Sequence, residues 1–115
     1  MKLINKTSGK VLVENLEVAD SFFTRMKGLL GRNNLPEGEG LHIIPCNDIH
    51  TFFMKFEFDA IFIDKKNIIR GLVENMQPGK VKFCFPAHSV IELCKGSISK
   101  TDTRLGDEVQ FIIKS

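Results

Sequence analysis

The sequence predicts one mainly β domain spanning residues 1–115, an antiparallel β sandwich or small barrel with one short helix at about residues 20–30. Three observations support this prediction. A chain of 115 residues has a common size for a single domain. Many short runs rich in Ile, Phe or Val are bounded by turn residues, as in all-β domains. Only one segment follows a helical period, and no repeat or low-complexity tract interrupts the chain.

The first strands are expected to form an N-terminal hairpin, because the apolar runs KLINK and VLVENLEV flank the turn TSGK. The helix follows, since apolar residues recur there on one face of a 3.6-residue period. Asp20 or Ser21 can cap its start, Gly31 suits the left-handed position after its end, and Arg25 falls on or beside the apolar stripe. The stripe consists of Phe22, Phe23, Met26, Leu29 and Leu30.

The rest of the chain is expected to consist of strands and loops. NNLPEGEG is a loop by its Asn, Pro and Gly content. KGSISKTDTRLGD is a polar connection with room for one helical turn. The expected strands are GLHIIPC, DIHTFFM, DAIFID, NIIRGLVENM, KFCF, SVIELC and EVQFIIK.

Charge and cysteine content narrow the class of protein. Sixteen Lys and Arg against fourteen Asp and Glu give a net charge of +2, and the two signs are interspersed. We therefore expect neither a nucleic acid, which needs a clustered basic face, nor an anionic membrane, which needs a polybasic run, as a partner. The N-terminus lacks the apolar core of a signal peptide, and the three cysteines show no C-x-x-C spacing. A cytoplasmic location with free thiols is expected.

The stretch CNDIHTFFMKFEFDAIFID, residues 46–64, places polar residues inside an apparent β-hairpin. If Lys55-Phe56 forms a two-residue turn, His50 and Asp59 become diagonal neighbours on one face, which they share with Phe52 and Met54. A carboxylate beside an imidazole can orient it as a general base. Asp59 also needs a partner because it lies between Phe58 and Ala60, and Arg25 or His50 could provide one.

Other interpretations of these residues carry less weight. Zinc needs three or four ligands, and Cys46 with His50 is not followed by a second pair at ligand spacing, so no metal or other cofactor is expected. A Cys46–His50 nucleophile needs a bend between the two residues. His50 can also be a histidine bonded to a backbone carbonyl, and Met54 can be packing. Asp64 and Asp107 are expected to be turn residues.

A pattern of spaced residues runs through most of the chain. It consists of Arg25, Gly28, Leu29, Ile49, His50, Thr51, Met54, Asp59, Phe62, Asp64, Glu92, Leu93, Gly96, Gly106 and Asp107. This pattern resembles that of the domain-of-unknown-function 192 family, over about residues 19–111. The resemblance implies a mainly β sandwich with a short helix and a pocket near the hairpin, but no established activity. Glu57 stands where relatives often have Pro, and the export signal of many relatives is lacking here.

The favoured hypothesis is a non-catalytic binding module for a small polar or anionic ligand. Its expected pocket contains Arg25, His50, Thr51, Met54 and Asp59, with Asp59 orienting Arg25 or His50. One alternative is an enzyme that uses His50 as general base beside Asp59. Another is a structural or protein-interaction domain whose polar core is satisfied internally. The sequence does not indicate an oligomeric state.

Overall fold

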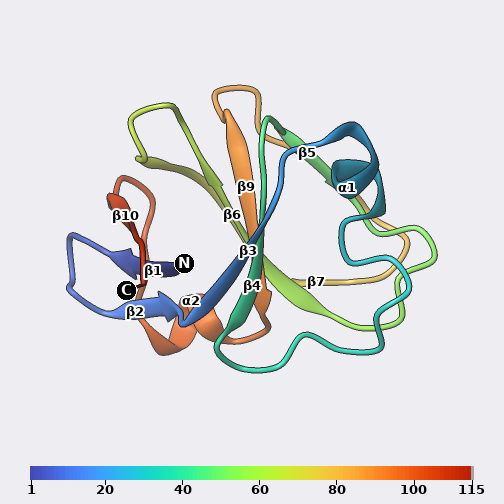
Figure 1. Ribbon diagram of the computed structural model, residues 1–115, viewed down its shortest axis with the longest axis horizontal. Helices are drawn as coiled ribbons and strands as arrows, with labels where there is room; N and C mark the ends of the chain where they lie inside the picture. Colours follow the sequence, from blue (N-terminus) through green and yellow to red (C-terminus); the bar gives the residue numbers. More distant parts are fainter. Residues whose placement is uncertain (115) are drawn as a thin grey trace.

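The computed structural model describes residues 1–114, apart from the side chains of Phe22, Phe23 and Met26. The helical stripe predicted at these three residues therefore lies outside the described residues. The chain is mainly β, with open sheets rather than a closed barrel (Figure 1). Among residues 1–114, neither helix has the length and apolar character needed to cross a membrane.

A five-stranded sheet forms the centre of the molecule, with strand order β3-β4-β9-β6-β7 (Figure 1). Neighbouring strands are antiparallel except β3 and β4, which are parallel because the chain crosses over through α1 between them. The predicted mainly β, antiparallel single-domain fold is confirmed, and the parallel pair β3–β4 departs from it. The five strands are β3 (Asn15–Ala19), β4 (Glu39–Ile43), β6 (Phe58–Ile63), β7 (Ile69–Met76) and β9 (Ser89–Cys94).

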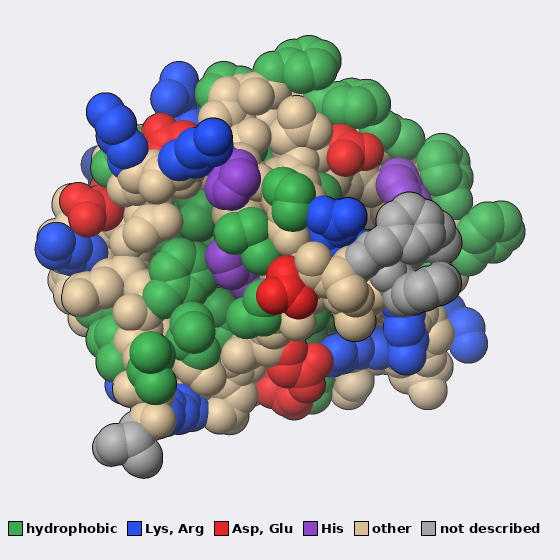
Figure 2. Space-filling view, turned by 45° about the horizontal axis from the view of Figure 1, so that its top comes forward, with side chains coloured by type: hydrophobic (Ala, Val, Ile, Leu, Met, Phe, Trp, Pro, Cys, Tyr) green, Lys and Arg blue, Asp and Glu red, His purple; other side chains and the backbone are tan. Residues whose placement is uncertain are grey.

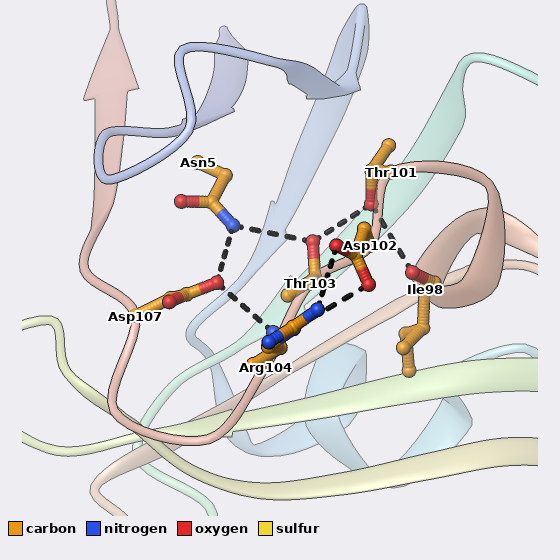
Figure 3. Close-up of polar contacts among 7 residues, drawn as sticks. All are labelled: Asn5, Ile98, Thr101, Asp102, Thr103, Arg104 and Asp107. Atoms are coloured by element: carbon orange, nitrogen blue, oxygen red, sulfur yellow. Dashed lines mark hydrogen bonds and ion pairs between the residues drawn. The ribbon is translucent and has the colours of Figure 1, made fainter.

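A second sheet confirms the predicted N-terminal hairpin. Strands β1 (Lys2–Asn5) and β2 (Val11–Val13) are antiparallel, and β10 (Val109–Ile112) pairs with the other edge of β1. Buried Asn5 ties this sheet to the loop before β10, because its Nδ2 donates to Thr103 Oγ1 and Asp107 Oδ2 (Figure 3). Asp107 also accepts a bond from the Arg104 backbone N–H, in agreement with its predicted turn role.

The two faces of the central sheet bury separate cores, which explains why every residue of β6 is buried. Phe58, Ala60 and Phe62 point to the face that is covered by α1 and the loops around it. Ile61 and Ile63 point to the opposite face, which packs against the β10-β1-β2 sheet. This alternation determines on which side of the sheet each polar residue of the strands lies.

Helix α1 (Phe22–Lys27) lies within the predicted range and is shorter than it. Ser21 caps its start in a capping box with Thr24, as the sequence predicts. The predicted end at Gly31 is wrong. Gly28 closes the helix instead, with φ of 48° and its N–H bonded to the Thr24 carbonyl. The polar connection after β9 contains the single helical turn α2 (Ser97–Lys100).

The predicted hairpin across Lys55-Phe56 is wrong. Strand β5 (Asp48–His50) pairs with β8 (Val81–Phe83) in a separate two-stranded sheet, whereas β6 lies between β7 and β9. The chain leaves the strand at Thr51, whose N–H donates to the Lys80 carbonyl. Every residue of β6 is buried and five of its six side chains are apolar. A strand of this kind is buried most fully at the centre of the large sheet, and this outweighs pairing with β5, its neighbour in the sequence.

Candidate functional site

A cavity of about 590 Å³ lies between the end of α1, strand β5 and the α1 side of the central sheet. Its lining combines apolar and ionisable side chains. On the face that Figure 2 shows, basic, acidic and histidine side chains likewise lie among hydrophobic ones. The lining residues are Arg25, Lys27, Gly28, Leu29, Leu30, Ile43, Pro45, Cys46, Asn47, Asp48, Ile49, His50, Met54, Ala87, His88 and Glu92.

Three of the five predicted site residues line this cavity. Arg25 reaches it from α1, His50 from β5 and Met54 from the loop that follows β5. Arg25 and Met54 are half-buried and His50 is exposed. Arg25 forms no ion pair with any of the described residues, so its guanidinium is available to a ligand.

Asp59 is buried but lies on the opposite face of the central sheet, because its neighbours Phe58 and Ala60 point to the α1 side. Its Oδ1 accepts the Asn75 backbone N–H at 2.9 Å, and its Oδ2 accepts the Ile98 N–H at 3.0 Å. The carboxylate therefore fixes β7 and the first turn of α2 to β6. The expected pairing of Asp59 with Arg25 or His50 does not form.

Thr51 is fully buried and has a structural role as well. Its Oγ1 accepts the Lys80 N–H at 2.8 Å and donates to the Gln77 carbonyl, while its own backbone carbonyl accepts the Gly79 N–H. Thr51 thus holds the turn before β8 against the end of β5. It positions His50 and is not itself part of the cavity lining.

Glu92 is the residue that the predicted site lacked. It lies in the middle of central strand β9, paired with Leu41 on one side and Ala60 on the other, and only 6% of it is exposed. The end of α1 lies over it, since a Cβ added at Gly28 would be 3.8 Å from Glu92 Oε1. This oxygen has no hydrogen-bond partner among the described residues.

Burial raises the pKa of Glu92 from its ordinary 4.5 to about 8, and the positive charge of Arg32 offsets only part of that effect. The carboxyl group is therefore mostly protonated at neutral pH. A protonated carboxyl group offers one O–H donor and retains acceptor capacity, so the cavity contains a neutral group that can both donate and accept.

Cys46 is another polar residue of the cavity lining. Cys46 donates its thiol to the Asp48 carbonyl at 2.9 Å, and burial is the main cause that raises the pKa of this thiol. The Cys46 backbone N–H donates to the His88 carbonyl, which joins two segments of the lining. A protonated, half-buried thiol is a poor nucleophile. Among residues 1–114, no three His, Cys, Asp or Glu side chains are grouped to hold a metal ion.

A second cavity, of about 460 Å³, lies on the other side of β4 and β9. It is lined by His42 and Ser89, which form a 2.9 Å hydrogen bond between Nε2 and Oγ, and by Phe111, which stacks on His42. Burial, and secondarily the charge of His88, lowers the pKa of His42 to about 4. The buried polar pair satisfies itself, unlike Glu92.

Glu92 could have been found from the sequence by the reasoning that singled out Asp59. In SVIELC, alternation places Val90 and Glu92 on one face and Ile91 and Leu93 on the other, so a carboxyl group must enter a core. What the sequence could not show is that α1 covers this part of the sheet incompletely and leaves a cavity over Glu92.

Comparison with known proteins agrees with the motif pattern. The model of the domain-of-unknown-function 192 family (DUF192, "Uncharacterized ACR") matches residues 3–111. The chain belongs to this family. The predicted resemblance is therefore confirmed, and with it the family's small β domain.

Two curated DUF192-like relatives are named UPF0127 protein. That of Thermococcus sibiricus is 32% identical over 120 residues, which covers 97% of this chain and 75% of the relative. That of Thermococcus gammatolerans is 29% identical over 117 residues, covering 95% and 74%.

Two solved structures share the fold. A protein of unknown function from Novosphingobium aromaticivorans has a TM-score of 0.84 at 22% identity, covering 96% of this chain and 84% of that one. A candidate transcription regulator from Sinorhizobium meliloti has a TM-score of 0.81 at 21% identity, covering 95% and 89%. At this level of identity the likeness shows the fold alone.

Proposed function

We propose that this DUF192 domain is a binding module for a small polar molecule that carries an anionic group, and that the cavity beside α1 is its site. The observation that carries the proposal is Glu92, whose Oε1 is buried in the cavity lining with no partner among the described residues. Leaving a buried polar atom unpaired costs roughly 1–3 kcal/mol. A ligand group that bonds to Glu92 would remove that penalty, whereas packing alone gives no reason to keep a Glu there.

The lining determines the chemistry of the ligand. Protonated Glu92 fits a hydroxyl, carbonyl or amide group, because it can donate to or accept from each of them. Arg25 and Lys27 supply positive charge for a carboxylate or phosphate, and Arg25 can bind either group with two parallel bonds. Leu29, Met54 and other apolar residues form the wall between these ends. A few placed polar groups in an apolar cavity are typical of small-molecule sites.

A thermal-shift panel tests the proposal. We would use small carboxylates and phosphate esters with a second polar group, and measure the melting temperature of the wild type, Glu92→Gln and Arg25→Gln. Binding to the native state alone raises the melting temperature, so at least one compound should stabilise the wild type. Arg25→Gln should lose that shift. Arg70→Gln is the matched control, because it removes the same charge at an exposed site outside the cavity.

The panel has two outcomes that would contradict the proposal. One is that no anionic compound stabilises the wild type. The other is that Arg70→Gln loses the shift as fully as Arg25→Gln, which would reveal nonspecific attraction to positive charge. Glu92→Gln tests the Glu92 end of the site separately from the Arg25 end. The glutamine side chain keeps the shape of the glutamate and changes only the hydrogen bonds that it can donate and accept.

An enzyme is the second candidate, for a different reason from the one the sequence suggested. Asp59 cannot orient His50, as its oxygens accept bonds on the other face of the sheet. Glu92, however, has a pKa near neutrality, which is favourable for general acid–base catalysis. Incubating the stabilising compound with the wild type and following it by NMR distinguishes the two. An unchanged compound supports the binding module, and a converted one supports the enzyme.

A further inference from the structure

The cavity beside α1 contains a carboxylate that the proposed function leaves unused. This is Asp48, the first residue of β5, which lines the cavity together with Arg25 of α1. Both residues are half-buried. Figure 1 shows α1 beside β5 at the same end of the molecule. The lining therefore includes two opposite charges, one from the helix and one from the strand.

Both charges act on the same group, the Cys46 thiol. Burial is the main reason why the pKa of this thiol is raised; the negative charge of Asp48 raises it further, and the positive charge of Arg25 lowers it. Such effects come from charges in the immediate surroundings of a group. Cys46 also lies in the cavity lining, and its thiol donates to the Asp48 backbone carbonyl at 2.9 Å. Asp48 and Arg25 are thus near enough to Cys46, and to each other, for one small molecule to contact both.

The protein itself does not pair these two charges. Among residues 1–114, no ion pair joins Asp48 to Arg25, and neither residue forms an ion pair with any other. Partly buried charges are screened by water and salt less than exposed ones, so an opposite charge stabilises them more. Asp48 and Arg25 are therefore both available to opposite charges on a ligand.

Asp48 differs in this respect from the carboxylates that have a structural role. Asp59 and Asp64 each accept two backbone N–H bonds, and Asp107 accepts one. Within the described part of the chain, the Asp48 carboxylate accepts no bond of this kind, and its hydrogen bond with Cys46 uses the backbone carbonyl. Local structure thus gives no reason for a carboxylate at this position.

We propose that the ligand of this cavity is a zwitterion of the amino-acid type, with its carboxylate on Arg25 and its ammonium group on Asp48. The inference rests on the proposed function and names the chemical class of the ligand. A carboxylate can form two parallel bonds with Arg25, and an ammonium group donates charge-assisted bonds to Asp48. Glu92 is then left for a polar group of the ligand's side chain, such as an amide or a hydroxyl. The apolar wall, which includes Leu29 and Met54, packs against the carbon atoms between these groups.

Ligands with a single charge fit this lining less well. A carboxylate alone would leave Asp48 without a partner and would lie near its negative charge. An amine alone would do the same at Arg25. Like charges brought together in a partly buried site repel each other, whereas a zwitterion gives each protein charge an opposite partner.

Isothermal titration calorimetry of the full chain with two matched sets of compounds tests the inference. The first set is glutamine, glutaramate, which lacks the ammonium group, and γ-aminobutyramide, which lacks the carboxylate. The second set is serine, β-hydroxypropionate and ethanolamine, which differ in the same way. In at least one set, the wild type should bind the amino acid about tenfold or more tighter than either analogue, because each analogue loses a charged hydrogen-bonding group.

Two variants assign the charges to the two ends of the ligand. Asp48→Asn should bind the amino acid about tenfold or more weakly and keep its affinity for the analogue without the ammonium group, so the preference between them disappears. Arg25→Gln should weaken both of these compounds. The matched control is Asp102→Asn, which removes an exposed carboxylate outside the cavity. Its backbone has φ of 52°, a conformation that Asn also adopts, and the variant should bind as the wild type does.

Three results would overturn the inference. In the first, glutaramate or β-hydroxypropionate binds as tightly as its amino acid, which leaves the proposed function standing and removes the zwitterion. In the second, Asp48→Asn has the melting temperature and the amino-acid affinity of the wild type. In the third, none of the six compounds binds to the wild type, and the proposed function is then decided by its own panel of carboxylates and phosphate esters. The comparison within each set uses the wild type alone, so it holds even where a variant fails to fold.

Discussion

Replacing Glu92 by Gln should change how the stability of this domain depends on pH. Glu92 has a pKa of about 8 in the folded chain and an ordinary value of 4.5 when exposed, so the folded state binds its proton more tightly. Below pH 4.5 both states are protonated and the group contributes its full stability. As pH rises towards 8 only the unfolded state releases the proton, and stability is lost until the folded group ionises too.

The size of this effect follows from the shift. One pKa unit corresponds to about 1.4 kcal/mol, so the wild type should lose about 1.4 kcal/mol per pH unit across this window through Glu92. The whole loss is on the order of 5 kcal/mol, a large part of the stability of a small domain. The glutamine side chain of the variant has the same shape and does not titrate. The difference in stability between Glu92→Gln and the wild type should therefore grow with pH at this slope.

Urea unfolding measures the difference. The chain has neither Trp nor Tyr, so far-UV circular dichroism is the suitable probe. Unfolding free energies would be determined at several pH values between about 5 and 9, with the m-value compared at each. Other titrating groups, including His42, are common to both proteins and cancel in the difference. Parallel curves for the two proteins would refute the reasoning, because they would mean that Glu92 has an ordinary pKa in the folded chain.

Three further predictions concern the other polar residues. Asp59→Asn should lower the free energy of unfolding by roughly 2–3 kcal/mol in urea, because it puts an amide N–H₂ against one of two backbone N–H groups. His50→Ala should lower it by less than about 0.5 kcal/mol. Equal decreases for the two variants would contradict the roles given to these residues. Thr51→Val should cost roughly 1–3 kcal/mol and speed hydrogen exchange at Lys80, whereas Thr51→Ser should keep both near wild type. His42, with a pKa of about 4 when folded against 6.5 when exposed, adds stability that is present above pH 6.5 and is lost as pH falls to about 4. In His42→Gln, the free energy of unfolding should fall less steeply as the pH is lowered from 6.5 to about 4. A fall as steep as in the wild type would show that His42 is not its cause.

Local features of this fold were predictable from the sequence because they depend on neighbours along the chain. The β1–β2 hairpin, the Ser21 cap and the turn roles of Asp64 and Asp107 are of this kind. The pairing of β5 was not predictable in this way. It depends on burying both faces of β6 in the middle of the large sheet, a non-local effect that outweighs the short connection between β5 and β6.

In the candidate site too, local features were predictable from the sequence and non-local ones were not. Arg25, His50 and Met54 line one cavity, but the hairpin that grouped His50 with Met54 and Asp59 in the sequence does not form. Their role in binding a ligand stays a prediction. Asp59 and Glu92 have the same appearance in sequence, a carboxylate inside an apolar strand. Only the three-dimensional structure separates them, because Asp59 meets two backbone N–H groups and Glu92 meets a cavity. The sequence shows which side chains of β6 and β9 share a face, because this depends on alternation along each strand. It does not show which segments of the chain cover each face.

Mapping a bound compound onto the backbone by ¹H–¹⁵N NMR tests the central claim most directly. The compound is the one that most stabilises the wild type in the thermal-shift panel. We predict that the amides with the largest shifts lie around the cavity, at Gly28, Cys46, His50 and Glu92, and that Arg25→Gln abolishes these shifts. Shifts gathered instead at His42, Ser89 and Phe111 would contradict the account, because they would place the ligand in the second cavity.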